Sequence, residues 1–126
     1  MAVTVDPLRL IGRGHVRATP EGIVTLRLRA AGEWRGTLEL ASARRISSRW
    51  LSRGRPRIVR LARRALVLHD GDNVVTVRLP AAQLALLRRM QSLQIAVGVP
   101  ATDDAGRHAR AARLMRLHAP ARVRTR

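Results

Sequence analysis

Apolar and polar residues alternate along the first half of the chain with the two-residue period of half-buried β-strands. Val24, Leu26 and Leu28 share one face of residues 22–29, and mostly polar residues occupy the other. Residues 34–40 repeat the alternation, and a short glycine-containing link joins the two runs. This pattern predicts two strands that form a hairpin.

Further strands are predicted on both sides of this pair. Residues 8–18 alternate weakly around two glycines, which indicates an edge strand. Residues 58–68 and 74–79 are apolar runs joined by a turn-forming segment, and we expect them to form a second hairpin. Residues 41–57 contain serines and arginines without a clear period, so we interpret them as a long solvated connection.

The pattern changes at residue 80, where a proline precedes strong helix formers and two arginines follow near the end. These features predict a short helix, because proline suits a helix start and arginine complements the dipole at a helix C-terminus. Residues 93–99 return to strand alternation. Residues 107–117 are ambiguous, since their composition favours a helix whereas their period favours a strand.

The number and spacing of these elements predict an all-β fold, an immunoglobulin-like β-sandwich of about seven strands with one short helix at about residues 80–90. The chain has 126 residues, which suits one domain. We divide it into an N-terminal edge segment at residues 1–14, the sandwich domain at residues 15–119 and a basic tail at residues 120–126, which we expect to be disordered.

Several short motifs follow one another in an order that resembles a known group of repeats. They are Glu21-Gly22 before an alternating run, Trp34-Arg-Gly-Thr-Leu-Glu-Leu, Val75-Thr-Val-Arg-Leu before the short helix, and Leu93 to Val99 running into Ala101-Thr-Asp-Asp-Ala-Gly106. In this order they resemble the immunoglobulin-like repeats found toward the C-termini of surface and secreted proteins of high-GC actinobacteria, over about residues 15–119. The resemblance implies that residues 107–117 form a strand paired with residues 93–99. It also implies a spacer or adhesion-type module without a reaction of its own.

One feature of those repeats is missing here. They often carry a cysteine near the end of the second strand and another before the Arg-Gly-Thr strand, and the nearest positions of this chain hold Ala30 and Trp34. The chain has no cysteine, which excludes a disulfide, a thiolate zinc site and a thiol nucleophile. Stability must therefore come from packing, and we expect Trp34 to pack into or cap the core.

The charge of the chain is strongly positive. All 25 cationic residues are arginine, only 8 residues are acidic, and the net charge is +17. Such a field attracts polyanions, whether nucleic acid, acidic polysaccharide or anionic lipid. An excess of alanine, arginine, glycine, valine and leucine is also what a GC-rich coding sequence produces, so charge alone does not select one of them. No run reaches the ~20 uncharged apolar residues of a membrane span, so no transmembrane segment is expected.

Arginines concentrate in the predicted connection, where the candidate residues for binding nucleic acid or another polyanion are Arg44, Arg45, Arg49, Arg53, Arg55 and Arg57. The segment Arg53-Gly54-Arg55-Pro56 resembles the core of an AT-hook, in which arginines reach along a narrow minor groove. A solvated basic loop is the alternative interpretation, since arginine is common throughout the chain. Trp50 lies in the same segment and is the candidate anchor on a partner surface, because tryptophan is enriched among interface hot spots.

A nucleic-acid-binding sheet is a separate hypothesis, and the outward strand positions it would use are Arg27, Arg29, Arg60 and Arg78. Sheets of that kind stack bases on aromatic side chains. The chain has two tryptophans and neither phenylalanine nor tyrosine, so this hypothesis predicts only nonspecific, salt-dependent phosphate contact.

Catalytic and metal-binding patterns are not found. Acidic residues cluster only where turns are expected, at residues 70–73 and 103–104. No ligand spacing relates the four histidines, which are His15, His69, His108 and His118. The serines and glycines match neither nucleophile nor nucleotide-binding motifs. We therefore expect no enzyme, no metal and no cofactor.

The resemblance implies a non-catalytic binding or spacer module of a bacterial cell-surface or secreted protein, and the charge predicts electrostatic affinity for polyanions. Its expected partner is an acidic polymer or an acidic protein surface, with nucleic acid bound only nonspecifically, and we expect a monomer or a part of a longer chain. The alternative is a cytosolic basic protein that binds nucleic acid through residues 44–57. The first residues lack the pattern of a secretory signal, so we expect either a cytosolic protein or a piece of a longer exported one.

Overall fold

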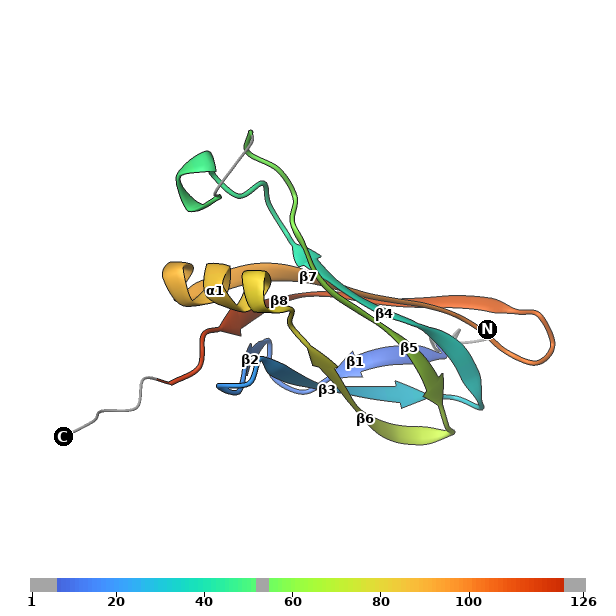
Figure 1. Ribbon diagram of the computed structural model, residues 1–126. Helices are drawn as coiled ribbons and strands as arrows, with labels where there is room; N and C mark the ends of the chain where they lie inside the picture. The colour runs from blue at the N-terminus through green and yellow to red at the C-terminus, as the bar shows by residue number, and fades with distance from the viewer. Residues whose placement is uncertain (1–6, 52–54, 122–126) are drawn as a thin grey trace.

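The alternating runs form two facing β-sheets with a single α-helix at one end, within the residues that this computed structural model describes, 7–51 and 55–121 (Figure 1). The helix α1 (Ala81–Met90) follows β6, and a 3₁₀ turn, η1 (Ser48–Trp50), lies between β4 and β5. The eight strands in this part of the chain are β1 (Leu8–Ile11), β2 (His15–Arg17), β3 (Ile23–Ala30), β4 (Trp34–Ser42), β5 (Arg60–Leu68), β6 (Gly71–Arg78), β7 (Ser92–Thr102) and β8 (His108–His118).

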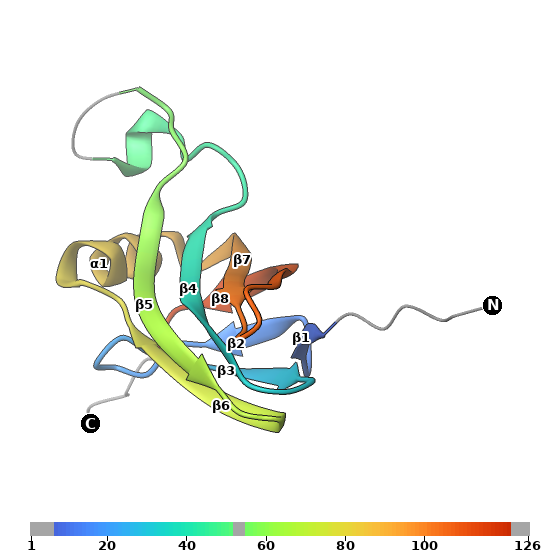
Figure 2. The same ribbon diagram turned by 90° about the vertical axis from the view of Figure 1, so that its right-hand side faces the viewer.

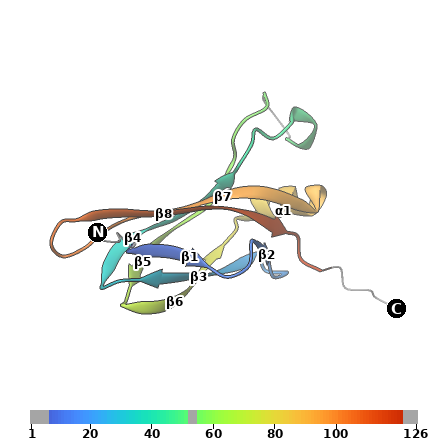
Figure 3. The ribbon, with the colours of Figure 1, turned by 180° about the vertical axis from the view of Figure 1, so that it is seen from behind.

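The small sheet has the order β1-β3-β6, and the large sheet has the order β2-β8-β7-β4-β5. The N-terminal segment contributes to both, because β1 pairs antiparallel with β3 whereas β2 pairs parallel with β8 (Figure 3). In immunoglobulin-like sandwiches the first, second and fifth strands share one sheet, and the third strand shares the other with the last two. The strands β1, β3 and β6 match the first group, and β4, β7 and β8 match the second. The predicted fold class is therefore confirmed.

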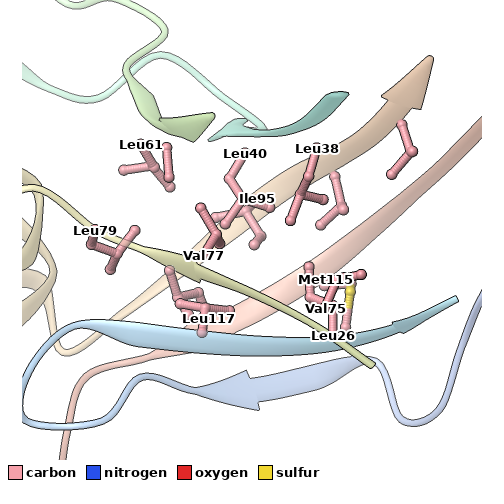
Figure 4. Packing of buried hydrophobic residues seen from close by; sticks show 14 of the residues in the cluster. Leu26, Leu38, Leu40, Leu61, Val75, Val77, Leu79, Ile95, Met115 and Leu117 are labelled. Atoms are coloured by element: carbon pink, nitrogen blue, oxygen red, sulfur yellow. The ribbon is translucent and has the colours of Figure 1, made fainter. Parts of the chain in front are cut away.

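The core lies between the sheets and is built from the inward-facing half of each alternation. Figure 4 shows side chains of both sheets meeting there, among them Leu26 and Val77 of the small sheet and Leu40, Ile95 and Leu117 of the large one. These five side chains are at most 3% exposed. Burying one such side chain stabilises the fold by about 1.5–3 kcal/mol, so the aliphatic filling supplies the main driving force.

Ala30 and Trp34 stand where the resembling repeats often carry cysteine, and both are 3% exposed. The indole Nε1 of Trp34 donates a hydrogen bond to the carbonyl oxygen of Ala31 at 2.9 Å. The prediction that Trp34 packs into the core is confirmed, and packing holds the two sheets together at this position.

The two hairpins predicted from the first part of the chain are wrong. The strands β3 and β4 lie in different sheets, and so do β5 and β6. Their connections cross between the layers, and the true neighbours are β3 with β6 and β4 with β5. Alternation reports which face of a strand is buried but not which strand lies beside it. A short turn with a glycine in the left-handed region, such as Gly32 with φ 89°, serves a crossing as well as a hairpin.

The ambiguous segment near the C-terminus is a strand. The strand β8 pairs antiparallel with β7 along its whole length, from His118 opposite Ser92 to His108 opposite Thr102. The pairing implied by the resemblance is confirmed, and the helix propensity of this segment is overridden because its apolar face completes the core. The helix predicted at about residues 80–90 is present as α1, which begins after Pro80.

Residues 43–59 between β4 and β5 form what we call the arm, and its described residues, 43–51 and 55–59, extend past the end of the large sheet (Figure 2). The prediction of a wholly solvated connection is wrong, because Ile46 is 2% exposed. The backbone of Ile46 forms a bridge with that of Arg57 across the arm. A single buried residue leaves no periodic signal, which explains why the sequence pattern missed it.

The ends of the chain add little to this architecture. The strand β1 lies within the predicted N-terminal edge segment and pairs along an edge of the small sheet. Pro120 and Ala121 follow β8 without regular structure, and the rest of the predicted tail lies outside the described residues. No helix in the described part of the chain is long and apolar enough to cross a membrane.

Candidate functional site

Charge divides the sandwich into two ends. We call residues 31–33, 69–73 and 103–107 the turn end, and the arm with α1 and the adjoining residues 92–94 and 116–118 the arm end. Of the seven carboxylates in the described chain, five lie at the turn end, namely those of Glu33, Asp70, Asp72, Asp103 and Asp104. By contrast, the sequence of the arm end, residues 43–59, 81–90, 92–94 and 116–118, contains nine arginines and no acidic residue. The excess positive charge of the molecule is therefore concentrated toward the arm end.

Carboxylates at the turn end form local structural bonds. Asp70 accepts a hydrogen bond from the backbone N–H of Gly32 at 2.7 Å, which joins the two crossings between the sheets. Asp103 accepts from the backbone N–H of Arg107 at 2.8 Å and from its Nε at 2.6 Å. Partial burial acts to raise the pKa of Asp103, but these bonds outweigh it and hold the pKa below its ordinary value. The hydrogen bond and charge of Arg29 lower the pKa of Asp72 in the same way.

The arm is fixed to the large sheet at its root. Ser42 is 2% exposed, its backbone N–H donates to the carbonyl oxygen of Val59, and its Oγ accepts from the backbone N–H of Val59, both at 2.9 Å. On the other side, the N–H of Ala43 donates to the carbonyl oxygen of Gln94 of β7 at 2.9 Å. Because both limbs of the arm are bonded at the root, the arginines that follow start from a defined position.

The arm, α1 and the end of the large sheet border a hollow of about 360 Å³ that is open to solvent. We call it the arginine hollow, and its lining includes Arg44, Arg45, Trp50, Met90, Ser92 and Arg116. None of the described residues that line it carries a carboxylate. Its cations come from two elements far apart in the sequence, the arm and β8, so the fold creates a concentration of guanidinium groups that neither segment has alone.

Trp50 stands between this hollow and a smaller depression of about 130 Å³, which Arg57 of the arm and Arg89 of α1 also line. The indole is half-buried and packs against the core, so it is less exposed than the anchor predicted from the sequence. The guanidinium of Arg49 lies 4.7 Å from the centre of the indole ring, within the range of a cation–π contact. One face of the tryptophan is thus engaged by a neighbour in the arm.

The predicted site residues separate into three groups. Arg44, Arg45 and Trp50 line the arginine hollow, Arg49 contacts Trp50, and Arg57 lines the smaller depression. Arg55 is exposed in the second limb of the arm. Arg53 and Gly54 lie outside the described residues, so the AT-hook-like segment is described only at Arg55 and Pro56.

Arg116 and Met90 belong to the same hollow but were missed by the sequence analysis. The signal for Arg116 was present in the two-residue period of residues 107–117, which puts it on the outer face of a strand. It could not be used without knowing that this strand lies beside the root of the arm. The side chain is held by a hydrogen bond from its Nη1 to Ser92 Oγ at 3.2 Å.

The outward strand arginines expected for a binding sheet are exposed, but they do not share one surface. Arg27, Arg29 and Arg78 belong to the small sheet, whereas Arg60 belongs to β5 of the large one. Arg29 is also paired with Asp72 at 2.8 Å. The arm end is therefore the better candidate surface.

The histidine and acidic side chains form no candidate metal site in the described part of the chain. In residues 7–51 and 55–121 no group of three or more histidine and acidic side chains is placed to hold a metal ion. The rings of His15 and His118 lie 5.8 Å apart on the neighbouring strands β2 and β8. Burial is the largest influence on His118, and together with the nearby charges of Arg17, His15 and Arg116 it lowers the pKa of that histidine.

The comparisons with known proteins leave the family of the chain open. No protein-family model matches it, and no curated protein sequence matches it either.

Proposed function

We propose that the chain is a non-catalytic binding or spacer module that attracts polyanions electrostatically through its arm end. The observation that carries this proposal is the separation of charge along the sandwich. Carboxylates cluster at the turn end, whereas the sequence of the arm end contains nine arginines and no acidic residue. A one-sided positive surface with a net charge of +17 raises the local concentration of polyanions.

The binding would be mainly electrostatic. Guanidinium groups that neutralise a polyanion release its condensed counterions, so affinity falls steeply as salt rises. For duplex DNA the logarithm of the affinity falls by about 0.9 per neutralised phosphate for each tenfold rise in salt. Several arm arginines acting together would therefore give a slope of several units.

The test is the affinity for a sulfated polysaccharide and for duplex DNA, each measured by fluorescence anisotropy at two salt concentrations. A steep loss of affinity for both polymers at the higher salt concentration is the expected result. An affinity that does not respond to salt, or no binding at low salt, would overturn the proposal.

We further propose a place for the module in a bacterial surface or secreted protein. This rests on the resemblance to actinobacterial immunoglobulin-like repeats, whose implied pairing of residues 107–117 with residues 93–99 is present as β7 and β8. The genomic sequence on both sides of this coding region tests the assignment. Neighbouring repeats or an encoded signal peptide would support it, and a free-standing gene without either would contradict it.

A cytosolic nucleic-acid-binding protein is the second candidate. Exposed Arg55 and Pro56 favour it, since they belong to the AT-hook-like segment. The double variant Arg53→Ala with Arg55→Ala separates the two candidates. Submicromolar binding to duplex DNA at physiological salt that this variant abolishes would favour the second candidate over the first.

A further inference from the structure

We propose that the arginine hollow is a subsite for one acidic sugar unit, so that the polyanion recognised by this module is a carboxylated or sulfated polysaccharide. This inference rests on the proposed function and adds a ligand class and a location to it. Three properties of the hollow support this assignment: the residues that line it, the bonds that hold this lining, and its shape.

The backbone that carries the cations of the hollow is held by the fold. Arg116 projects from β8 at a position that pairs with both β2 and β7, and its guanidinium is bonded to Ser92 Oγ at 3.2 Å. Arg44 and Arg45 directly follow Ala43, whose backbone is bonded to Gln94 of β7. The buried side chain of Ile46 then anchors the arm after them. A site on fixed elements loses less conformational entropy on binding than a flexible basic loop does.

The lining combines the groups that an acidic sugar requires. A guanidinium presents a planar fork of donors that matches a carboxylate or sulfate with two parallel hydrogen bonds. Trp50 and Met90 add an apolar wall, against which the C–H face of a sugar ring can pack. The side chains of Gln94 and Ser92 line the same hollow and supply polar partners for ring hydroxyls. A volume of about 360 Å³ lies within the usual range of small-ligand sites.

Two other hollows of similar size lack this combination. The one on the outer face of the large sheet, about 380 Å³, includes the carboxylate of Glu39 and mostly small side chains. The one beside β1, about 330 Å³, is lined by Arg9, Arg110 and Arg113 but has no aromatic residue. Of these three, only the arginine hollow joins several cations to an aromatic wall without an acid.

Nucleic acid fits the hollow less well. Proteins that bind single strands stack successive bases on several aromatic side chains. Here Trp50 has no second exposed aromatic partner, because the other tryptophan, Trp34, is 3% exposed at the opposite end and the chain has no phenylalanine or tyrosine. A duplex groove is read by an element that protrudes into it; the arm extends past the sheet (Figure 2), but the lining of the hollow itself is concave.

The experiment compares two variants of equal charge. The triple variant Arg44→Gln, Arg45→Gln and Arg116→Gln removes three cations of the hollow. The control variant removes three exposed arginines elsewhere, Arg9→Gln, Arg27→Gln and Arg35→Gln. Both carry a net charge of +14, since 17 minus 3 is 14. The probes are a sulfated hexasaccharide and a single-stranded DNA of the same charge, titrated by calorimetry, and thermal unfolding by circular dichroism verifies that each variant is folded.

We expect the hollow variant to lose about tenfold or more in affinity for the hexasaccharide and the control variant to lose much less, because charge-assisted hydrogen bonds are lost only in the first. Trp50→Leu should weaken hexasaccharide binding without changing the net charge. Equal losses in the two triple variants would overturn the hollow as a subsite while leaving the electrostatic proposal intact. Tighter binding of the DNA with the same dependence on the hollow would overturn the sugar assignment. Failure of the unmodified protein to bind either probe at low salt would overturn the proposed function itself.

Discussion

At the turn end of the sandwich, carboxylates accept hydrogen bonds from backbone N–H groups and from arginines that lie beside them, as Asp70 does from Gly32 and Asp103 does from Arg107. At the arm end, Arg44, Arg45 and Arg116 line one hollow that contains no acid. Arginine thus pairs with carboxylates at the turn end, whereas Arg44 and Arg45 are exposed at the arm end. Under the proposed function, these exposed arginines bind an external partner, whereas the paired charges at the turn end stabilise the fold.

The largest effect is expected from a change in the core, because the core supports both ends of the sandwich. Val97 is 1% exposed and faces the core from the middle of β7. Val97→Asp should cost several kcal/mol and unfold the domain, because it buries an unpaired carboxylate. The matched control is Ala96→Asp on the exposed face of the same strand, which should remain folded. An intact β-sheet spectrum in the Val97→Asp variant, recorded by circular dichroism, would mean that the inward face is misassigned.

A milder change acts on the root of the arm alone. Ser42→Ala leaves the partly buried N–H of Val59 without the side-chain acceptor it has now, and we expect a loss of about 0.5–1.5 kcal/mol in the free energy of unfolding. Denaturant titration measures this loss. Ser47→Ala, at an exposed position of the arm, should leave stability unchanged. Equal stability in both variants would mean that Ser42 does not fix the root.

A pair of variants sharpens the contrast between the ends. Asp103→Ala should lower the melting temperature slightly without weakening polyanion binding, because it removes turn-end bonds and raises the net charge by one. Arg44→Ala with Arg45→Ala should weaken binding and leave the melting temperature almost unchanged. Calorimetry and thermal unfolding on the same samples measure both effects. Weaker polyanion binding in the Asp103→Ala variant, or a lower melting temperature in the arginine double variant, would contradict this contrast.

The smallest expected effect is a difference in the pH response of the ends. Because the pKa of His118 is lowered in the folded state, the unfolded chain binds a proton more readily than the folded chain does. The free energy of unfolding is therefore highest above about pH 6.5 and falls as the pH drops from there through the lower pKa of the folded state. The lowered pKa values of Asp72 and Asp103 act in the same direction but only below about pH 3.8. His118→Gln should remove the loss of stability that begins below about pH 6.5 and keep the loss that begins below about pH 3.8. Melting temperatures recorded across this pH range test it, and an unchanged loss below about pH 6.5 in the variant would exclude His118 as its source.

The sequence pattern predicted the buried faces better than the neighbours of the strands. Alternation correctly placed the side chain of Val97 inward, because burial of one face acts on every second residue of a strand. It did not reveal that β3 and β5 each lead into the opposite sheet, since the same glycine-containing turn permits a hairpin or a crossing. Propensity also misjudged residues 108–118, where a strand wins because its apolar face closes the core.

The candidate site was predictable only in part for the same reason. The arginines of the arm lie close together in the sequence, so their local concentration was evident without the structure. Arg116 and Met90 are distant in sequence and reach the hollow only through the order of the strands and the position of α1. Ile46 was missed because one buried residue in an irregular segment has no period to reveal it.

The most direct test of the central claim is to map where a polyanion touches the protein. Backbone amide chemical shifts can be followed by nuclear magnetic resonance while a sulfated hexasaccharide is added at low salt. The account predicts that the largest shifts fall in the arm, in α1 and in residues 92–94 and 116–118, with little change at the turn end. Shifts spread evenly over the surface, or concentrated on residues 31–33, 69–73 and 103–107, would contradict it.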